Sequence, residues 1–264
     1  MRYATPVQLA EVVRAKGVLD TRVLDALERI PRANFVPPEV SADAYLDRPL
    51  PIPHEPVTTQ PSLVALMVEA LELTGEEHVL EIGTGYGFQS ALLARLAAFV
   101  WSVERWEDLA REARKNLALG RIENVEVLVG DGSEGLREHA PYDAIIVSAA
   151  FPRVPTPLAD QLAEDGRLVQ PIGPGGCEDV RLYTKAAGRL VRRRGAALGD
   201  AALEVDDHEV GVAHRLDDLT CEEGFGAGQA QPLGDLPPEH GVTREREPHR
   251  ESHAARTGGR SGRA

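Results

Sequence analysis

The first part of the chain alternates apolar and polar residues with a helical period. Residues 7–16 and 20–30 carry apolar side chains three or four positions apart, which predicts two amphipathic helices, and Pro31 ends the second. A proline-rich connection over residues 35–56 offers few amides for a strand ladder, so we expect it to be irregular. A third helix is predicted over residues 61–73, with proline in its first turn.

After residue 77 the pattern changes to short apolar runs separated by amphipathic ones. It predicts strands at 78–82, 100–103, 125–129, 142–147 and 167–169, helices at 89–98, 109–119 and 158–162, and a hairpin over 180–191. Strands that alternate with helices of this length form a parallel sheet with right-handed crossovers. We therefore predict an α/β fold with a doubly wound, mostly parallel sheet, whose ligand would bind beyond the carboxyl ends of the strands.

Composition divides the chain into three parts. Residues 1–60 form an N-terminal helical and proline-rich segment, and residues 61–195 form the α/β core. Residues 196–264 contain 14 acidic residues, 7 arginines and one aromatic residue, Phe225. Because such a segment buries too little apolar surface to offset the entropy of ordering, we expect a poorly structured, flexible tail.

Charge and composition exclude several classes of function. The net charge of −13 disfavours a nucleic-acid partner, since binding phosphates requires a basic face. The chain has no long uncharged apolar run and no export signal, so we expect a cytoplasmic protein without a membrane partner. We also expect it to act as a monomer. Cys177 and Cys221 lack metal-binding spacing, and no metal is expected.

The strongest chemical signal follows the first predicted strand. Glu81 precedes Gly83, Thr84, Gly85 and Gly87, and glycines at alternate positions let the backbone turn tightly and approach a ligand closely. The next helix would present free amides to an anion. A dinucleotide site would require glycine where the chain has phenylalanine, at position 88, which disfavours NAD.

Acidic residues also end the next two predicted strands. Glu104 could accept hydrogen bonds from ribose hydroxyls, and Asp131, followed by Gly132, could accept from an adenine amino group. Each feature alone has a structural explanation, as a tight turn, a solvated strand end or a helix cap. With Glu81, they together suit a nucleoside that carries an ammonium and a carboxylate, such as S-adenosyl-L-methionine.

Longer sequence motifs indicate the family to which such a methyl-donor site would belong. Residues 79–87, 129–132, 140–147 and 166–173, together with Ile-Pro-Arg at 30–32, Phe-Val-Pro at 35–37 and Gln-Pro at 60–61, resemble the protein-L-isoaspartate O-methyltransferase family. The resemblance covers about residues 20–194. It implies a Rossmann-like class I methyltransferase fold with an N-terminal helical addition. It also implies S-adenosyl-L-methionine as cofactor and methylation of L-isoaspartyl carboxylates in damaged proteins, whose esters then cyclise to succinimide.

Two departures from the family stand out. Where the family usually carries Gly-Gln-Thr-Ile-Ser before Gln60, residues 53–59 read Pro-His-Glu-Pro-Val-Thr-Thr, so a threonine takes the place of the serine. The family also closes with a strand for which we find no match after Arg194. A homologue that methylates another peptide or protein carboxylate, or a cofactor-binding protein without turnover, therefore remains open.

The expected chemistry requires alignment rather than a general base, because a carboxylate is already ionised at neutral pH. We accordingly expect His54 to be a structural or surface residue. Thr59 is the residue we assign to catalytic positioning. Substrate contacts are expected from the hydroxyl and amide groups of Thr58, Thr59, Ser148, Ala149 and Ala150.

Overall fold

The computed structural model describes residues 5–54, 57–173, 177–193, 202–205 and 210–212, with backbone only for 177–178 and for the last two ranges. The chain divides into two units, Met1–Gly224 and Phe225–Ala264, and all described residues belong to the first. Most of the tail predicted to be flexible, and Cys221, therefore lie outside the described residues.

The predicted helices are confirmed with small shifts of their ends. They are α1 (Pro6–Ala15), α2 (Thr21–Arg29), α3 (Pro61–Ala70), α4 (Phe88–Ala94), α5 (Glu107–Leu119) and α6 (Thr156–Gln161). The side chains of Thr5 and Asp20 accept backbone N–H groups at the starts of α1 and α2, which fixes where these helices begin. Short 3-10 helices, which the periodicity does not predict, occupy Arg32–Phe35, Pro38–Asp43, Gly132–Glu134 and Arg137–His139.

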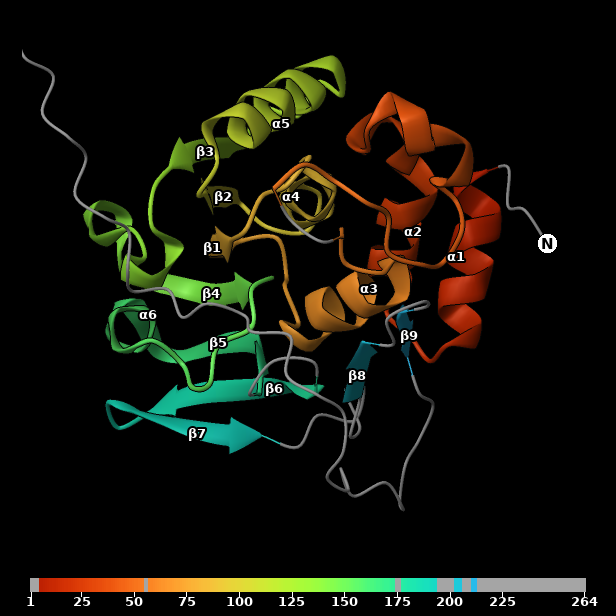
Figure 1. Cartoon of the computed structure of the whole chain (residues 1–264). Helices are drawn as coiled ribbons and strands as arrows, with labels where there is room; N and C mark the ends of the chain where they lie inside the picture. The colour runs from red at the N-terminus through yellow and green to blue at the C-terminus, as the bar shows by residue number, and fades with distance from the viewer. Residues whose placement is uncertain (1–4, 55–56, 174–176, 194–201, 206–209, 213–264) are drawn as a thin grey trace, which may run out of the picture. The chain divides into compact units, whose positions relative to one another are not determined.

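The strands form a doubly wound sheet, as predicted. They are β1 (His78–Ile82), β2 (Phe99–Glu104), β3 (Val125–Val129), β4 (Tyr142–Val147), β5 (Leu162–Ile172), β6 (Cys177–Ala186), β7 (Arg189–Arg193), β8 (Ala202–Val205) and β9 (Val210–Val212). Over the described residues the sheet order is β3-β2-β1-β4-β5-β6-β8-β9, and β7 pairs with β6 (Figure 1). Strands β1 to β5 are parallel to one another, whereas β6 runs antiparallel to β5.

The second half of the sheet departs from the expectation in two ways. β5 is much longer than the predicted 167–169, because Leu162 already pairs with Tyr142 before a bulge interrupts the ladder. Two short strands follow Arg194, where we expected no closing strand: β8 pairs with the start of β6, and β9 pairs with β8. Their pairing is long-range, and segments of three or four residues are too short for the apolar pattern to identify.

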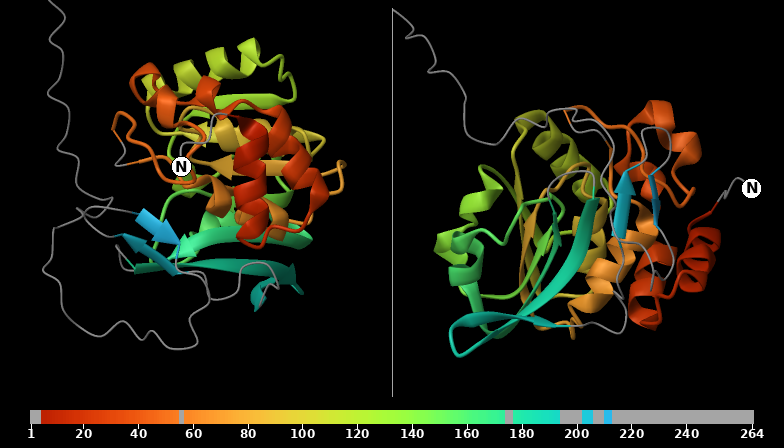
Figure 2. Two further views of the ribbon diagram at one scale, coloured as in Figure 1. Left: turned by 90° about the vertical axis from the view of Figure 1, so that its right-hand side faces the viewer. Right: turned by 60° about the horizontal axis from the view of Figure 1, so that its bottom comes forward.

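Two hydrophobic layers enclose the sheet. On one face, α3, α4 and α5 cover the strands, and α1 and α2 pack outside α3 (Figure 2). The buried residues of the first 60 positions, among them Leu9, Leu24 and Phe35, belong to the same core cluster as the sheet residues Val79 and Ile146. The N-terminal segment therefore shares its core with the α/β part. On the other face, α6 contributes to a separate cluster.

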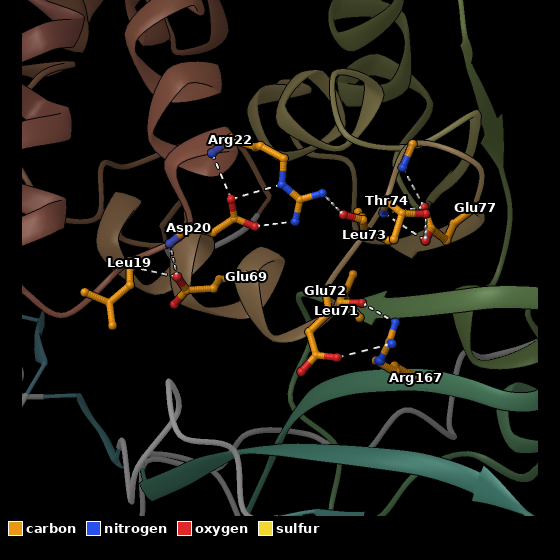
Figure 3. Close-up of polar contacts among 11 residues, drawn as sticks. Leu19, Asp20, Arg22, Glu69, Leu71, Glu72, Leu73, Thr74, Glu77 and Arg167 are labelled. Carbon is orange, nitrogen blue, oxygen red and sulfur yellow. Dashed lines mark hydrogen bonds and ion pairs between the residues drawn. The ribbon is translucent and has the colours of Figure 1, made fainter.

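The end of α3 is the polar junction between the N-terminal helices and the sheet (Figure 3). Glu69 accepts the backbone N–H groups that precede α2, at Leu19 and Asp20, with distances of 2.7 and 2.5 Å. Arg22 donates to the carbonyl of Leu73, and Arg167 of β5 donates to that of Leu71 at 2.8 Å. The contacts of Glu69 and Arg22 hold the N-terminal segment against the C-terminal end of α3, and the contact of Arg167 holds β5 against the same end.

No helix in the described part of the chain is long and apolar enough to cross a membrane.

Candidate cofactor and substrate site

The topology brings the four predicted acidic and glycine motifs to one edge of the sheet. Ile82 is in register with Val103 and Val147, and Glu104 is in register with Val129, so β1, β2, β3 and β4 end side by side. The strand order reverses between β1 and β4, which is where ligands bind in doubly wound sheets.

The glycine turn adopts the backbone conformation that the sequence requires. Gly83, Gly85 and Gly87 have φ values of +91°, +55° and +90°, in the left-handed region that residues with a Cβ avoid. Gly87 is also the cap residue of α4. The turn is fixed to its neighbours, because Gly83 donates to the carbonyl of Val103 at 2.9 Å.

Glu104 accepts a hydrogen bond directly from this turn. Its Oε2 accepts the N–H of Gly85 at 2.8 Å, its Oε1 accepts the N–H of Trp106 at 3.0 Å, and the residue is only 4% exposed. Each carboxylate oxygen has a second lone pair, so both can still accept a hydroxyl. The turn thus holds the carboxylate of Glu104 in a fixed position, which a group that accepts hydrogen bonds from ribose hydroxyls requires.

Glu81 is placed differently, since it is completely buried. Its carboxylate accepts from Ser102 at 2.6 Å, from Gln89 at 3.1 Å and from the hydroxyl of Ser90. Burial raises the pKa of Glu81 to about 7, although these three donors partly offset that effect. Glu81 therefore lacks direct access to a ligand and acts on the turn through Ser102, which is 2.5 Å from the hydroxyl of Thr84.

Asp131 and Gly132 lie beyond β3, at the same edge. Asp131 is exposed and caps a short helix, accepting from the N–H and the hydroxyl of Ser133 at 2.9 and 2.7 Å. Gly132 packs tightly, because a Cβ at this position would lie 2.3 Å from Cγ2 of Ile82. The backbone after β3 therefore runs directly against the end of β1.

The predicted substrate residues lie on two segments. Ser148 accepts from Gln89 at 3.0 Å, and its own N–H donates to the carbonyl of Ile82, which ties the segment after β4 to the glycine turn. Ala149 and Ala150 follow and are exposed. On the other segment, Thr58 and Thr59 are half-buried before α3. Glu55 and Pro56, which replace residues typical of the family, lie outside the described residues.

His54 is on the surface, where we expected it, and it has specific partners. Its Nε2 lies 2.8 Å from Oδ2 of Asp108, and its ring stacks on Trp106 with 4.5 Å between centroids. The hydrogen bond from His54 lowers the pKa of the Asp108 carboxyl. His54 therefore fastens the start of the altered 53–59 segment to α5, beside Glu104.

Sequence reasoning missed Gln89, Ser90, Ser102 and Arg32 as parts of this region. The first three lie in a helix and a strand, where the pattern of apolar residues indicates only which face is buried and not what a polar side chain contacts. Arg32 belongs to the Ile-Pro-Arg motif, and only its burial indicates a role. The described residues contain no group of three or more His, Cys, Asp or Glu side chains that could hold a metal ion.

The residues at this edge fit S-adenosyl-L-methionine. A buried carboxylate that the glycine turn holds in place can accept the ribose hydroxyls, and the turn itself lets backbone approach the ligand. The sheet order, the helical layers and this edge define a class I S-adenosyl-L-methionine-dependent methyltransferase fold.

Comparison with known proteins identifies the family within this class. Residues 5–197 match the sequence profile of protein-L-isoaspartate(D-aspartate) O-methyltransferase, and the chain belongs to this family. A protein-L-isoaspartate O-methyltransferase of Methanoculleus marisnigri is 52% identical over 178 residues, which are 67% of this chain and 81% of the relative. One from Anaeromyxobacter dehalogenans strain 2CP-C is 52% identical over 183 residues, 68% of this chain and 87% of the relative.

Two solved structures are similar to this chain in fold. A protein-L-isoaspartate O-methyltransferase structure is 31% identical, with a TM-score of 0.62, and the match covers 74% of this chain and 67% of that one. A Plasmodium falciparum structure in complex with S-adenosyl-L-homocysteine is 23% identical with a TM-score of 0.63, covering 73% and 95%, and it shares the fold.

Proposed function

We propose that this chain transfers a methyl group from S-adenosyl-L-methionine to the free carboxylate of L-isoaspartyl residues in damaged proteins, as an enzyme of protein repair. The observation that carries the proposal is the juxtaposition of two elements. Glu104 and the glycine turn form the proposed cofactor edge. The proline-rich part of the N-terminal segment contacts that edge, because Ile52 lies 3.8 Å from the point that a Cβ on Gly85 would occupy and His54 stacks on Trp106.

When bound, S-adenosyl-L-methionine supplies a methyl group activated on a sulfonium. The roles proposed for this chain are binding and alignment, since an ionised carboxylate is already a nucleophile. For the cofactor we propose direct contacts from Gly83, Gly85, Gly87, Glu104, Asp131 and Gly132, with Glu81 and Thr84 supporting the turn. For the substrate carboxylate we propose Thr58, Ser148, Ala149 and Ala150, with Thr59 as the catalytic positioning residue.

The remaining proposals concern the setting of the reaction. We propose that the enzyme is a cytoplasmic monomer that acts on protein rather than nucleic acid, which its net charge of −13 supports. We also propose that the chain divides by function into a substrate-side segment (1–60), a cofactor-binding core (61–195) and an acidic tail (196–264).

A comparison of two peptides tests the function. Purified full-length chain is incubated with methyl-labelled S-adenosyl-L-methionine and an isoaspartyl peptide, or its normal aspartyl twin. We expect label in the isoaspartyl peptide only. Label in the aspartyl peptide would instead indicate a homologue with a different carboxylate substrate. Binding of S-adenosyl-L-homocysteine without transfer to either peptide would indicate a cofactor-binding protein.

A further inference from the structure

Arg32 is a fully buried cation at the centre of the N-terminal segment. The residue is 1% exposed, and its guanidinium donates to the carbonyls of three residues of the proline-rich connection, at 3.0 to 3.4 Å (Ala44, Leu46 and Arg48). Burial lowers the pKa of Arg32 to about 10, so the group stays charged at neutral pH.

This charge has no carboxylate among its hydrogen-bond partners in the described residues. Asp47 is near enough to influence it, yet Asp47 already pairs with Lys16 at 2.8 Å and accepts from Gln60 and the N–H of Ser62. Buried charges in proteins are normally paired with an opposite charge, and the guanidinium of Arg32 is hydrogen-bonded only to neutral acceptors among the described residues. Its positive charge can therefore attract a further anion.

The fourth partner of Arg32 is Thr58. Oγ1 of Thr58 accepts from Arg32 at 3.0 Å and from the N–H of Leu50 at 3.0 Å. A hydroxyl has two acceptor lone pairs and one proton to donate, so both lone pairs are occupied. No acceptor for that proton lies among the described residues, and Thr58 is only half-buried. The hydroxyl is therefore available solely as a donor, and its charged partner strengthens it in that role.

Two contacts place this pair beside the cofactor edge. The Arg32 guanidinium lies 5.7 Å from the ring centroid of Phe88, the first residue of α4 after the glycine turn. In the same loop as Thr58, Ile52 reaches to 3.8 Å from the point that a Cβ on Gly85 would occupy. The segment from Leu50 to Thr58 is closed by the hydrogen bond between the Thr58 N–H and the Leu50 carbonyl, at 2.7 Å.

We propose that Arg32 is a positioning residue for the substrate carboxylate. By occupying an acceptor lone pair of Thr58, Arg32 orients the threonine hydroxyl so that it donates its hydrogen bond to that carboxylate. The inference rests on the proposed function, because it takes the isoaspartyl carboxylate as the anion. Arg32 itself does not touch the substrate. Its positive charge adds an attraction for carboxylate over neutral groups, since little solvent screens a charge at this depth.

The test compares two competing peptides in the presence of S-adenosyl-L-homocysteine. One is an isoaspartyl peptide, and the other is the same peptide with the free carboxylate converted to a carboxamide. Their dissociation constants for the full-length chain give a carboxylate preference, which is measured for the wild type, Thr58→Val, Thr58→Ser and Arg32→Gln. Thermal unfolding and affinity for S-adenosyl-L-homocysteine are measured in parallel.

We expect the carboxylate preference to fall about tenfold in Thr58→Val and in Arg32→Gln, and to be retained in Thr58→Ser, which keeps the hydroxyl. Thr58→Val should leave cofactor affinity unchanged, so it remains informative even if Arg32→Gln folds poorly. An unchanged preference in Thr58→Val, or equal weakening of both peptides, would overturn the inference. Failure of the wild type to methylate the isoaspartyl peptide would count against the proposed function instead.

Discussion

Replacing Glu81 with glutamine should change how the stability of this protein depends on pH. The wild-type carboxyl has a pKa of about 7 in the folded chain, against 4.5 for the free side chain. The folded state therefore binds the proton more tightly than the unfolded state. Stability from this group is complete below pH 4.5 and is lost as the pH rises through 7.

The structure sets the size of the effect. The pKa difference corresponds to ~3 kcal/mol of unfolding free energy, of which about 2–3 kcal/mol would be lost between pH 5 and 8. Glu81→Gln has no proton to exchange and keeps an oxygen that can accept from Ser90 or Ser102. The variant is expected to lose about 1–3 kcal/mol at low pH, because the amide satisfies fewer of these donors.

Urea unfolding of the wild type and Glu81→Gln, at several pH values from 5 to 8, measures the difference. Other titrating groups contribute equally to both proteins, so the stability difference between them isolates Glu81. We expect the wild type to lose its advantage as the pH rises. Parallel pH profiles would refute the reasoning, since they would show that burial does not raise the pKa of this carboxyl.

Two further predictions concern the cofactor edge. Glu104→Gln should weaken binding of S-adenosyl-L-homocysteine by ~1–3 kcal/mol in calorimetric titration, because the charged acceptor is lost, whereas Glu107→Gln on the exposed start of α5 should not; equal affinities would remove Glu104 from the site. Gly132→Ala should destabilise the fold by about 1–3 kcal/mol, because its Cβ would meet the β-branched Ile82 at 2.3 Å. Gly130→Ala, with 3.6 Å to its nearest neighbour, is the matched control, and equal melting temperatures would contradict the packing argument.

The strands and the glycine turn could be predicted because their signals are local. Alternation of apolar residues reports which face of a strand is buried, and three glycines at alternate positions report the left-handed backbone that Gly83, Gly85 and Gly87 adopt. The doubly wound parallel sheet followed from the alternation of strands and helices, whereas the order of the strands came only from the structure. β8 and β9 were not predicted, because strands of three or four residues are too short to show an alternating apolar pattern.

The roles of the polar residues could be predicted only in part. Glu81 and Glu104 both follow the pattern of an acid at a strand end, yet one is enclosed by α4 and β2 while the other holds the turn. The same spacing therefore yields two environments. The difference depends on which helix packs over each strand end, and no local pattern contains that information.

By itself, the sequence determined the class of fold, the family and the edge of the sheet where we propose that the cofactor binds, because periodicity and glycine geometry act within a few residues. Only the tertiary structure decided which polar groups are enclosed and what each one contacts. Arg32 and Thr58 are 26 positions apart and meet solely because the proline-rich connection folds back over the glycine turn. Burial and hydrogen bonding between distant segments are properties of the packed chain, and they give these side chains their charge state and direction.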